Sequence, residues 1–394
     1  MHPHIPVSFL LTLLLHLQPG SAIAPLLISK RDYERVSAPE TVTTAPSFFS
    51  YIGRSISKLF RRKPDPPEFV QPPAVRPTPV TLDTLTICTW NIFRFGPNKF
   101  SVPDPLIVAG KNVTRLDIIV DQLRDCHLAV IQELDDKTGS VAERLRMELQ
   151  KRTGNPFSAI VSPRLGIRNL EQYLFLYRDD LLTAGVSAVF PDAPDPAQRL
   201  FHRQPYFTNF TAKAQGKQLR LLRGALRSFV IGTVHTVPTR AVEEISSLVA
   251  AFDWAAQTYR TSNVMILGDY NGDCQYVRAR DWPRIPLWTQ ARFAWLVPTG
   301  TDTTSMTTHC TYDRAVNIGN VFNSTLVPGS VEAPNFPQKF SLTPAQAKLV
   351  SDHRLVRLQF QMTKRKATAG PRKKIKKLNN KFNKQCATGT EYRV

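Results

Sequence analysis

Six segments of the sequence end in polar or ionisable residues directly after an apolar run. These residues are Asn91, Glu133, His235, Asp269 with Asn271, Asp313, and Asp352 with His353. Carboxylate and amide oxygens suit hard divalent cations, and histidine can exchange a proton near neutral pH. Any one of them alone is typical of an ordinary polar turn. Because ligand-binding loops of α/β sheets gather where strands end, the whole set predicts one catalytic or metal-binding site.

The adjacent residues Ser351, Asp352 and His353 do not predict a serine nucleophile. Consecutive side chains in extended chain point to opposite faces, so these three cannot hydrogen-bond in series. The sequence also contains no G-x-S-x-G motif. Asp352 and His353 therefore need partners from elsewhere in the chain.

The elements that must position these residues alternate between strands and helices from Thr84 onwards. Strand patterns cover residues 84–92, 128–133, 173–178, 227–236, 264–269, 311–316 and 354–360. Helical spacing covers residues 112–124, 141–152 and 239–260, with Thr239 as a candidate N-cap of the last helix. This succession predicts an α/β domain with a large central sheet or sandwich.

The regions outside this domain carry most of the net charge, which is +20 for 394 residues. Residues 1–24 hold a short apolar stretch followed by small residues, which predicts a signal peptide, with an uncleaved anchor as the alternative. Residues 25–80 are Pro-rich and basic, and we expect a disordered pro-region or linker. We place the catalytic domain at 81–362 and a disordered basic tail, with eleven Lys and Arg and one acid, at 363–394.

Several other features agree with secretion into an extracellular or secretory-pathway compartment. No later segment reaches about 18 uninterrupted apolar residues, so no transmembrane span is expected. Asn112, Asn209 and Asn323 lie in N-x-[ST] sequons and are predicted glycosylation sites. The five cysteines show no zinc-site spacing, and they allow at most two disulfides.

Seven motifs, in this order and spacing, resemble the deoxyribonuclease I family of the endonuclease/exonuclease/phosphatase superfamily. They are TWNIFRFG (89–96), IQE (131–133), EQYLFLYR (171–178), GTVHTVP (232–238), ILGDYNGDC (266–274), DTTSMTTHCTYDR (302–314) and SDHRLV (351–356). The resemblance covers residues 84–361. It implies a four-layered α/β sandwich with two central mixed β-sheets, and a divalent-metal-dependent endonuclease that hydrolyses DNA.

The resemblance also implies roles for individual residues. Phosphodiester hydrolysis requires an activated water, neutralisation of developing charge, and a proton for the leaving oxygen. By resemblance the catalytic histidines are His235 and His353, oriented by Glu171 and Asp313. The residues expected at the scissile phosphate are Asp269, Asn271 and the substrate-binding Arg203.

Metal sites and one disulfide follow from the same resemblance. Mg²⁺ or Mn²⁺ is expected near Glu133, Asn91 and Asp352. A structural Ca²⁺ is expected at Asp302 with Thr304 and Thr308, although Met306 lacks the oxygen of the family pattern. The resemblance pairs Cys274 with Cys310. Cys88 lies within a strand pattern and is expected to be a buried thiol, while Cys126 and Cys386 have no assigned partner.

Departures from the family pattern bear on the expected partners. Asp135 stands where the family has a DNA-gripping arginine, and Asn169 stands where it has a minor-groove tyrosine, which should weaken the usual duplex binding. Ala159 lacks the aromatic ring of actin-binding members, so actin binding is not expected. The basic tail resembles that of gamma-type enzymes and would bind DNA, chromatin or other polyanions through counterion release.

A monomer is expected, and two alternative functions remain open at this point. The first is a superfamily phosphodiesterase acting on another substrate, as a sphingomyelinase or phosphoinositide phosphatase does. The second is a non-catalytic polyanion-binding protein. Glu133, His235, Asp269 and His353 are all present, which favours catalysis.

Overall fold

The computed structural model describes residues 83–100, 105–108, 111–167, 169–213 and 226–362. The chain divides into two units, Met1–Ala74 and Val75–Val394, and every described residue belongs to the second. The predicted signal peptide (1–24), the linker (25–80) and the tail with Cys386 lie outside the described residues. Within the described ranges, no helix has the length and hydropathy that crossing a bilayer demands.

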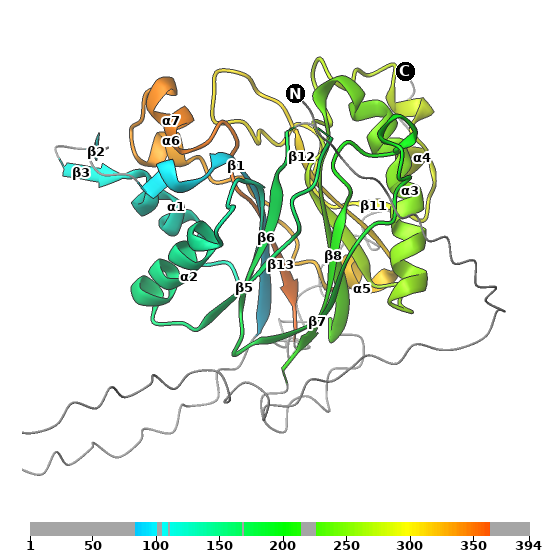
Figure 1. Ribbon diagram of the computed structural model, residues 1–394, viewed down its shortest axis with the longest axis horizontal. Helices are drawn as coiled ribbons and strands as arrows, with labels where there is room; N and C mark the ends of the chain where they lie inside the picture. Colours follow the sequence, from blue (N-terminus) through cyan, green and yellow to red (C-terminus); the bar gives the residue numbers. More distant parts are fainter. Residues whose placement is uncertain (1–82, 101–104, 109–110, 168, 214–225, 363–394) are drawn as a thin grey trace, which may run out of the picture. The chain divides into compact units, whose positions relative to one another are not determined.

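Two mixed β-sheets form the centre of the described domain (Figure 1). The first has, in spatial order, β13 (Val356–Gln361), β1 (Thr84–Phe95), β4 (Leu128–Leu134), β6 (Gln172–Arg178) and β5 (Phe157–Val161). The second has β11 (Ala294–Trp295), β12 (Asp313–Ile318), β10 (Val264–Asp269), β9 (Ser228–His235), β8 (Tyr206–Ala212) and β7 (Leu182–Val189). A separate hairpin pairs β2 (Pro105–Val108) with β3 (Lys111–Thr114). Each large sheet has one parallel pair near its centre, β1 with β4 and β9 with β10.

Helices cover the outer face of each sheet, as Figure 1 shows. The first sheet carries α1 (Arg115–Leu123), α2 (Ser140–Thr153), α6 (Phe336–Lys339) and α7 (Pro344–Val350), and the second carries α3 (Ala241–Thr258) and α4 (Pro286–Thr289). Phe322 of the short α5 (Asn320–Thr325) joins the core between the two sheets. The four-layered α/β sandwich predicted from the resemblance is confirmed.

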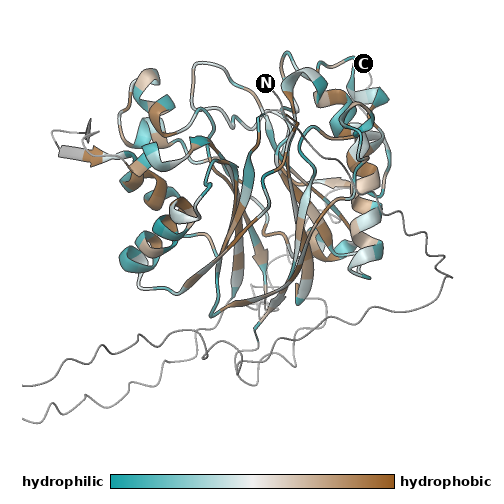
Figure 2. Cartoon of the chain, in the orientation of Figure 1, coloured by the Kyte–Doolittle hydropathy of each residue, from teal (hydrophilic) through white to brown (hydrophobic). Residues whose placement is uncertain are grey.

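Strand β1 is buried on both faces because each face meets a different core. Leu85 and Ile87 pack between the sheets, whereas Cys88, Trp90 and Ile92 pack under the helices. This follows from the alternation of side chains along a strand, which a continuous apolar run fills on both sides. Figure 2 shows hydrophobic residues along the strands and on the helix faces turned toward them.

Two predicted helix starts need correction. Helix α1 begins after Thr114, which forms a capping box with Asp117, because the preceding residues pair with β2 as a strand. Helix α3 begins after Arg240 and has no side-chain N-cap. Thr239 lies instead in the 3₁₀ turn Pro238–Arg240, so the predicted cap is wrong.

The expectation that Cys88 is a free thiol is also wrong, because Cys88 forms a disulfide with Cys126. Cys126 follows α1, where the chain turns back into β4, and β4 runs parallel to β1. This crossover brings the two Cα atoms to 6.0 Å, although the residues are 38 apart in sequence. The bond therefore ties the α1–β4 connection to β1, the strand that neighbours β4 in the first sheet.

His127, the residue before β4, makes the stability of the domain sensitive to acid. Its Nδ1 accepts a hydrogen bond from the Thr86 N–H at 3.0 Å. Burial, together with the nearby Arg178, lowers the pKa of His127 from 6.5 to about 4. Between these two values the unfolded chain binds a proton that the folded chain does not, so the free energy of unfolding falls as the pH falls.

We predict that His127→Asn, which keeps an acceptor but does not titrate, removes this part of the pH dependence. The wild type should lose up to about 3 kcal/mol relative to the variant between pH 7 and pH 4. Urea unfolding of both proteins across this range measures the difference. A difference that stays constant with pH would contradict the assignment.

A candidate active site where the two sheets meet

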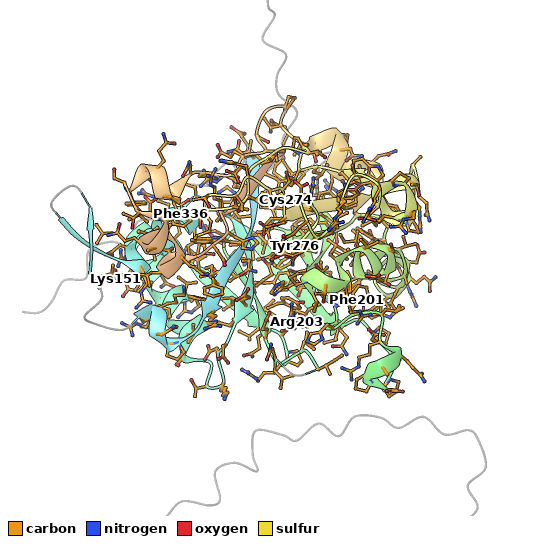
Figure 3. All side chains as sticks on the ribbon, turned by 90° about the horizontal axis from the view of Figure 1, so that it is seen from above. Lys151, Phe201, Arg203, Cys274, Tyr276 and Phe336 are labelled. Atoms are coloured by element: carbon orange, nitrogen blue, oxygen red, sulfur yellow. A yellow bond between two sulfur atoms is a disulfide. The ribbon has the colours of Figure 1, made fainter. Side chains whose placement is uncertain are left out.

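The ionisable residues predicted from the sequence meet at one edge shared by both sheets. In the second sheet Asp269, at the end of β10, lies in register with His235 of β9 on one side and Asp313 of β12 on the other. The first sheet contributes Asn91 from β1 and Glu133 from β4. The sequence brings these residues together because parallel strands end, and their antiparallel neighbours begin, at the same edge. Figure 3 looks down on this edge and labels Cys274 and Tyr276 on the loop that follows β10.

The carboxylate of Asp269 is the central group of the site and is only 1% exposed. Its Oδ2 accepts a hydrogen bond from Asn91 Nδ2 at 3.0 Å, and its Oδ1 accepts one from the Asn271 N–H at 2.8 Å. Asn91 Nδ2 also donates to Glu133 Oε1 at 3.0 Å, so one amide joins two carboxylates. Burial acts to raise the pKa of Asp269, but two nearby histidines and these hydrogen bonds offset it, and the net pKa is lowered.

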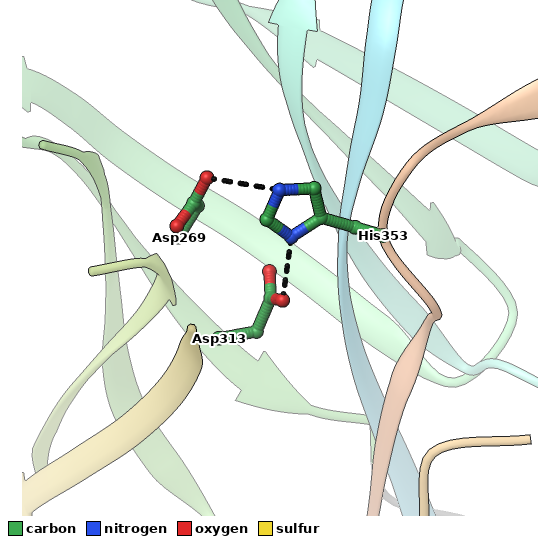
Figure 4. Close-up of side chains that lie close together, drawn as sticks. All are labelled: Asp269, Asp313 and His353. Carbon is green, nitrogen blue, oxygen red and sulfur yellow. Dashed lines mark hydrogen bonds and ion pairs between the residues drawn. The ribbon is translucent and has the colours of Figure 1, made fainter. Parts of the chain in front are cut away.

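Two histidine–carboxylate pairs face Asp269 from opposite sides. Nδ1 of His235 lies 2.8 Å from Glu171 Oε2, and Nδ1 of His353 lies 2.7 Å from Asp313 Oδ2. The free Nε2 atoms lie 3.6 Å (His235) and 3.4 Å (His353) from the same Asp269 oxygen, Oδ2. Figure 4 shows the second pair together with Asp269.

The neighbouring carboxylates raise the pKa of both imidazoles. Burial lowers the pKa of His235, and Arg203 lowers it further, but Glu171 and Asp269 more than offset both, so the pKa is raised. Burial also lowers the pKa of His353, yet Asp313 and Asp269 raise it well above its ordinary value. Each carboxylate on Nδ1 fixes the ring orientation and leaves Nε2 for proton exchange.

Arg203 and Asn271 are already engaged within the protein. Arg203 is 5% exposed, and its Nη1 lies 3.2 Å from Glu171 Oε1 while its Nε donates to the His235 carbonyl at 3.1 Å. Asn271 Nδ2 donates to the Thr236 carbonyl at 3.0 Å. Both residues border the site, and their contacts with substrate stay a prediction.

Strained backbone surrounds the acidic residues. Glu133, Arg94 and Asn271 have φ values of 61°, 49° and 46°, in the left-handed region that non-glycine residues rarely adopt. The Arg94 N–H donates to Glu133 Oε2 at 2.8 Å, which holds this carboxylate at the irregularity between β1 and β4. Before Asp269, a side chain at Gly268 (φ 145°) would place its Cβ 2.1 Å from the Val234 carbonyl oxygen, so only glycine fits.

Sequence reasoning missed three residues that support the site. Gln132 is fully buried, and its Nε2 donates to Thr89 Oγ1 in its own sheet at 3.1 Å and to Thr233 Oγ1 in the other sheet at 2.9 Å. The Tyr173 hydroxyl accepts a hydrogen bond from the His235 N–H at 3.1 Å, and Trp90 Nε1 donates to the His353 carbonyl at 2.8 Å. A polar residue inside an apolar strand pattern was the available signal for Gln132, because buried polar groups need partners.

Among the described residues, one cluster of His, Cys, Asp and Glu side chains could hold a metal: Asp269, Asp313 and His353, with ligand atoms within 4.8 Å of one another. Asp313 and His353 are, however, already hydrogen-bonded to each other. Asn91 offers a better donor, because its Oδ1 is buried and has no hydrogen-bond partner among the described residues. Asn91, Glu133 and Asp269 could together hold an ion through oxygen atoms, the ligands that Mg²⁺ and Mn²⁺ prefer.

The other predicted metal ligands lie differently. Asp352 is half-buried and acts on His353 through its charge, but its side chain makes no hydrogen bond or ion pair with another described residue. The Asp302 carboxylate lies 2.9 Å from both Arg354 Nη2 and His309 Nδ1. A guanidinium and an imidazole thus contact the carboxylate at which Ca²⁺ was expected.

The remaining predicted positions lie away from this edge, except one disulfide. Cys274 and Cys310 are bonded, as predicted, and join the loop after β10 to the loop before β12. Of the sequons, Asn323 is exposed on α5, whereas Asn209 is half-buried against Gly185 of the neighbouring strand. The Asn112 side chain lies outside the described part. Glycosylation stays a prediction at all three.

The chain is similar to several known proteins. The catalytic domain of human nocturnin with bound sulfate has a TM-score of 0.46 at 13% identity, covering 71% of this chain and 95% of that one. Residues 88–353 match the endonuclease/exonuclease/phosphatase family model. Human deoxyribonuclease-1 is 32% identical over 276 residues, 68% of this chain and 90% of the human protein. Human deoxyribonuclease gamma is 31% identical over 301 residues, 74% and 92% of the two chains. The chain belongs to the deoxyribonuclease I family.

Two departures from the deoxyribonuclease I family pattern lie on the rim of the site. Asp135 forms an ion pair with Arg164, with Oδ1 and Nη1 2.8 Å apart, and Asn169 is exposed close to Glu171. On the other side of Glu133, the Phe93 ring lies under Arg94 and Lys348, at 5.1 and 5.4 Å from the ring centre. Positive charge is therefore present beside the site, but at other positions than the family pattern places it.

We predict that Glu171→Gln lowers the pKa of His235, because the carboxylate that stabilises the imidazolium is removed. NMR titration of the imidazole protons, in chelator and without metal, measures this pKa. His353, which is paired with Asp313, serves as the internal control and should titrate as in the wild type. An unchanged His235 pKa would show that the Glu171 contact does not govern its protonation.

Proposed function

We propose that this chain is a DNA-hydrolysing endonuclease whose chemistry is carried by His235 and His353. The chain belongs to the deoxyribonuclease I family, and the relatives described above are named deoxyribonucleases. The observation that carries the proposal is the convergence of the two Nε2 atoms on Asp269 Oδ2, at 3.6 and 3.4 Å. Each Nδ1 is held by its own carboxylate, so both rings present a proton-exchanging nitrogen to the same point.

In this proposal the two imidazoles divide the proton transfers. One accepts a proton at Nε2 from the attacking water, and the other donates a proton from Nε2 to the leaving oxygen. Glu171 and Asp313 keep the rings oriented and stabilise the protonated form. Asn271, whose N–H donates to Asp269, is assigned the positioning of a phosphate oxygen in this proposal.

We further propose that Mg²⁺ or Mn²⁺ is held by Glu133, Asn91 and Asp269. The unpartnered Asn91 Oδ1 and the two carboxylates that its Nδ2 joins support this oxygen set. A bound divalent ion would neutralise the charge that develops on the phosphoryl oxygens. Asp352, half-buried beside His353, remains a predicted additional ligand.

Nicking of supercoiled plasmid tests the catalytic assignment. His235→Ala and His353→Ala should each reduce the rate by roughly 10²–10⁴-fold, because general acid–base catalysis of this size is lost. EDTA should abolish wild-type activity. His127→Asn is the matched control, since it alters a histidine outside the site and should nick like the wild type. Full activity in either alanine variant would exclude these roles.

The same preparations can be offered a sphingomyelin and a phosphoinositide substrate. The reason to test other phosphodiesters is Asp135, which is exposed and paired with Arg164 on the rim. The deoxyribonuclease I family pattern has an arginine that grips DNA at this position. Turnover of a lipid phosphoester with plasmid left intact would replace the nuclease proposal by that alternative. Absence of turnover on all substrates would favour a non-catalytic polyanion-binding protein.

We propose that residues 363–394 direct the enzyme to chromatin-associated DNA. These residues lie outside the described part, and the proposal rests on their eleven Lys and Arg against one acid. A flexible polycation releases counterions from nucleic acid without reading sequence, and its binding weakens steeply with salt.

Deletion of residues 363–394 should leave nicking of naked plasmid at low salt close to wild type and reduce cleavage of nucleosomal DNA by about tenfold or more. The comparison should be repeated at two salt concentrations. Equal losses on naked and nucleosomal DNA would contradict a role in chromatin targeting.

We also propose that the enzyme is secreted and works in an oxidising compartment. Two disulfides, Cys88–Cys126 and Cys274–Cys310, support this, because structural disulfides are rare in the reducing cytosol. The exposed sequon at Asn323 and the signal-like residues 1–24 agree with it. The second disulfide joins two loops that border the site, so reduction would loosen the catalytic edge.

A further inference from the structure

Arg354, the residue after His353, inserts its guanidinium into the loop that precedes β12. Its Nη2 lies 2.9 Å from Asp302 Oδ2, and the two side chains are 12% and 19% exposed. The Arg354 N–H donates to the Thr303 carbonyl at 2.7 Å, so side chain and backbone bind the same loop. The remaining Asp302 oxygen, Oδ1, accepts hydrogen bonds from the Thr304 N–H at 3.1 Å and the Thr304 hydroxyl at 2.7 Å.

The loop held by Arg354 also holds one of the two histidine–carboxylate pairs. Thr304 forms a β-bridge with His353, and the Ser305 N–H donates to the Asp352 carbonyl at 2.9 Å. The Thr303 hydroxyl oxygen accepts from the Asp313 N–H at 3.2 Å. The ion pair between Arg354 and Asp302 therefore lies one residue from His353 along the chain, and the loop connects it to Asp313.

The residues of this loop do not fit a calcium ion. Ca²⁺ requires six to eight oxygen ligands. Both Asp302 oxygens are already hydrogen-bonded, one of them to a guanidinium and to His309 Nδ1 at 2.9 Å. Met306 contributes a thioether instead of an oxygen. A cation at this carboxylate would have to displace the fixed positive charge of Arg354, and like charges repel strongly where solvent is largely excluded.

We propose that Arg354 is a positioning residue whose guanidinium replaces a structural calcium ion. It neutralises Asp302, clamps the 302–310 loop against the segment before β13 that carries His353, and keeps the His353–Asp313 pair aligned without calcium. This inference rests on the proposed nuclease function only where it concerns catalysis. The stability of the loop, and a Tm that does not change with calcium, are properties of the fold and do not depend on that function.

Three substitutions on two neighbouring arginines test the proposal. Arg354→Met should lower kcat for plasmid nicking by about tenfold to a hundredfold with little change in KM, because a displaced histidine loses alignment and not substrate affinity. Arg354→Lys keeps the charge and should recover part of the loss. Arg357→Met is the matched control. Arg357 lies three residues further on, in β13, is 16% exposed and forms a 3.1 Å ion pair with Glu332. This control should lower Tm but leave kcat unchanged.

The effect of calcium on Tm tests the stability of the loop separately from catalysis. Wild-type Tm, measured without Mg²⁺, should be the same in EGTA and in millimolar CaCl₂. A calcium-dependent rise in Tm that Asp302→Asn abolishes would overturn the proposal, and so would equal kcat for wild type and Arg354→Met. If the wild type does not nick DNA at all, the nuclease function fails, and the Tm measurements still decide whether Arg354 has replaced the ion.

Discussion

The buried carboxylate of Asp269 is the constraint on which the rest of the site depends. A charge that is 1% exposed is costly to the fold unless other groups solvate it. Here one sheet supplies Asn91, the other supplies His235, and the chain beyond supplies His353 and the Asn271 N–H. The two sheets must meet in one relative position to satisfy this oxygen, so the requirement that stabilises the junction also assembles the catalytic groups.

A second polar contact, deeper in the sandwich, fixes the same relative position. Gln132 of β4 donates to Thr233 of β9 across an otherwise apolar interface. Gln132 directly precedes Glu133, and Thr233 lies two residues before His235, so this contact sets the register of the two sheets next to the site. The positive φ of Glu133 is the consequence: the chain leaves regular strand geometry to turn the carboxylate toward Asn91.

The sequence predicted the site more completely than it predicted the contacts that hold it. Strand ends, and the acids and histidines on them, were visible because each is a local pattern, and the resemblance supplied the pairs His235–Glu171 and His353–Asp313. For contacts between distant segments, no local pattern identified the partner, even where a buried polar residue such as Gln132 indicated that one was needed. Cys88 with Cys126, and Gln132 with Thr233, depend on which strands become neighbours, which periodicity alone does not specify. The ion pair between Asp302 and Arg354 likewise joins two segments distant in the sequence, so no local pattern around Asp302 indicated it.

Two arginine–carboxylate pairs show how this chain departs from its family without leaving charges unbalanced. Asp135 is neutralised by Arg164, and Asp302 by Arg354. Each pair is satisfied internally, so neither offers a free charge to a metal ion or a phosphate. Within the described domain, attraction for a polyanion must therefore come from cations that lack an acidic partner among the described residues. Arg94 and Lys348, over the Phe93 ring beside Glu133, meet that condition. Arg94 also donates its N–H to Glu133, so this positive charge lies beside the candidate site instead of at Asp135 and Asn169.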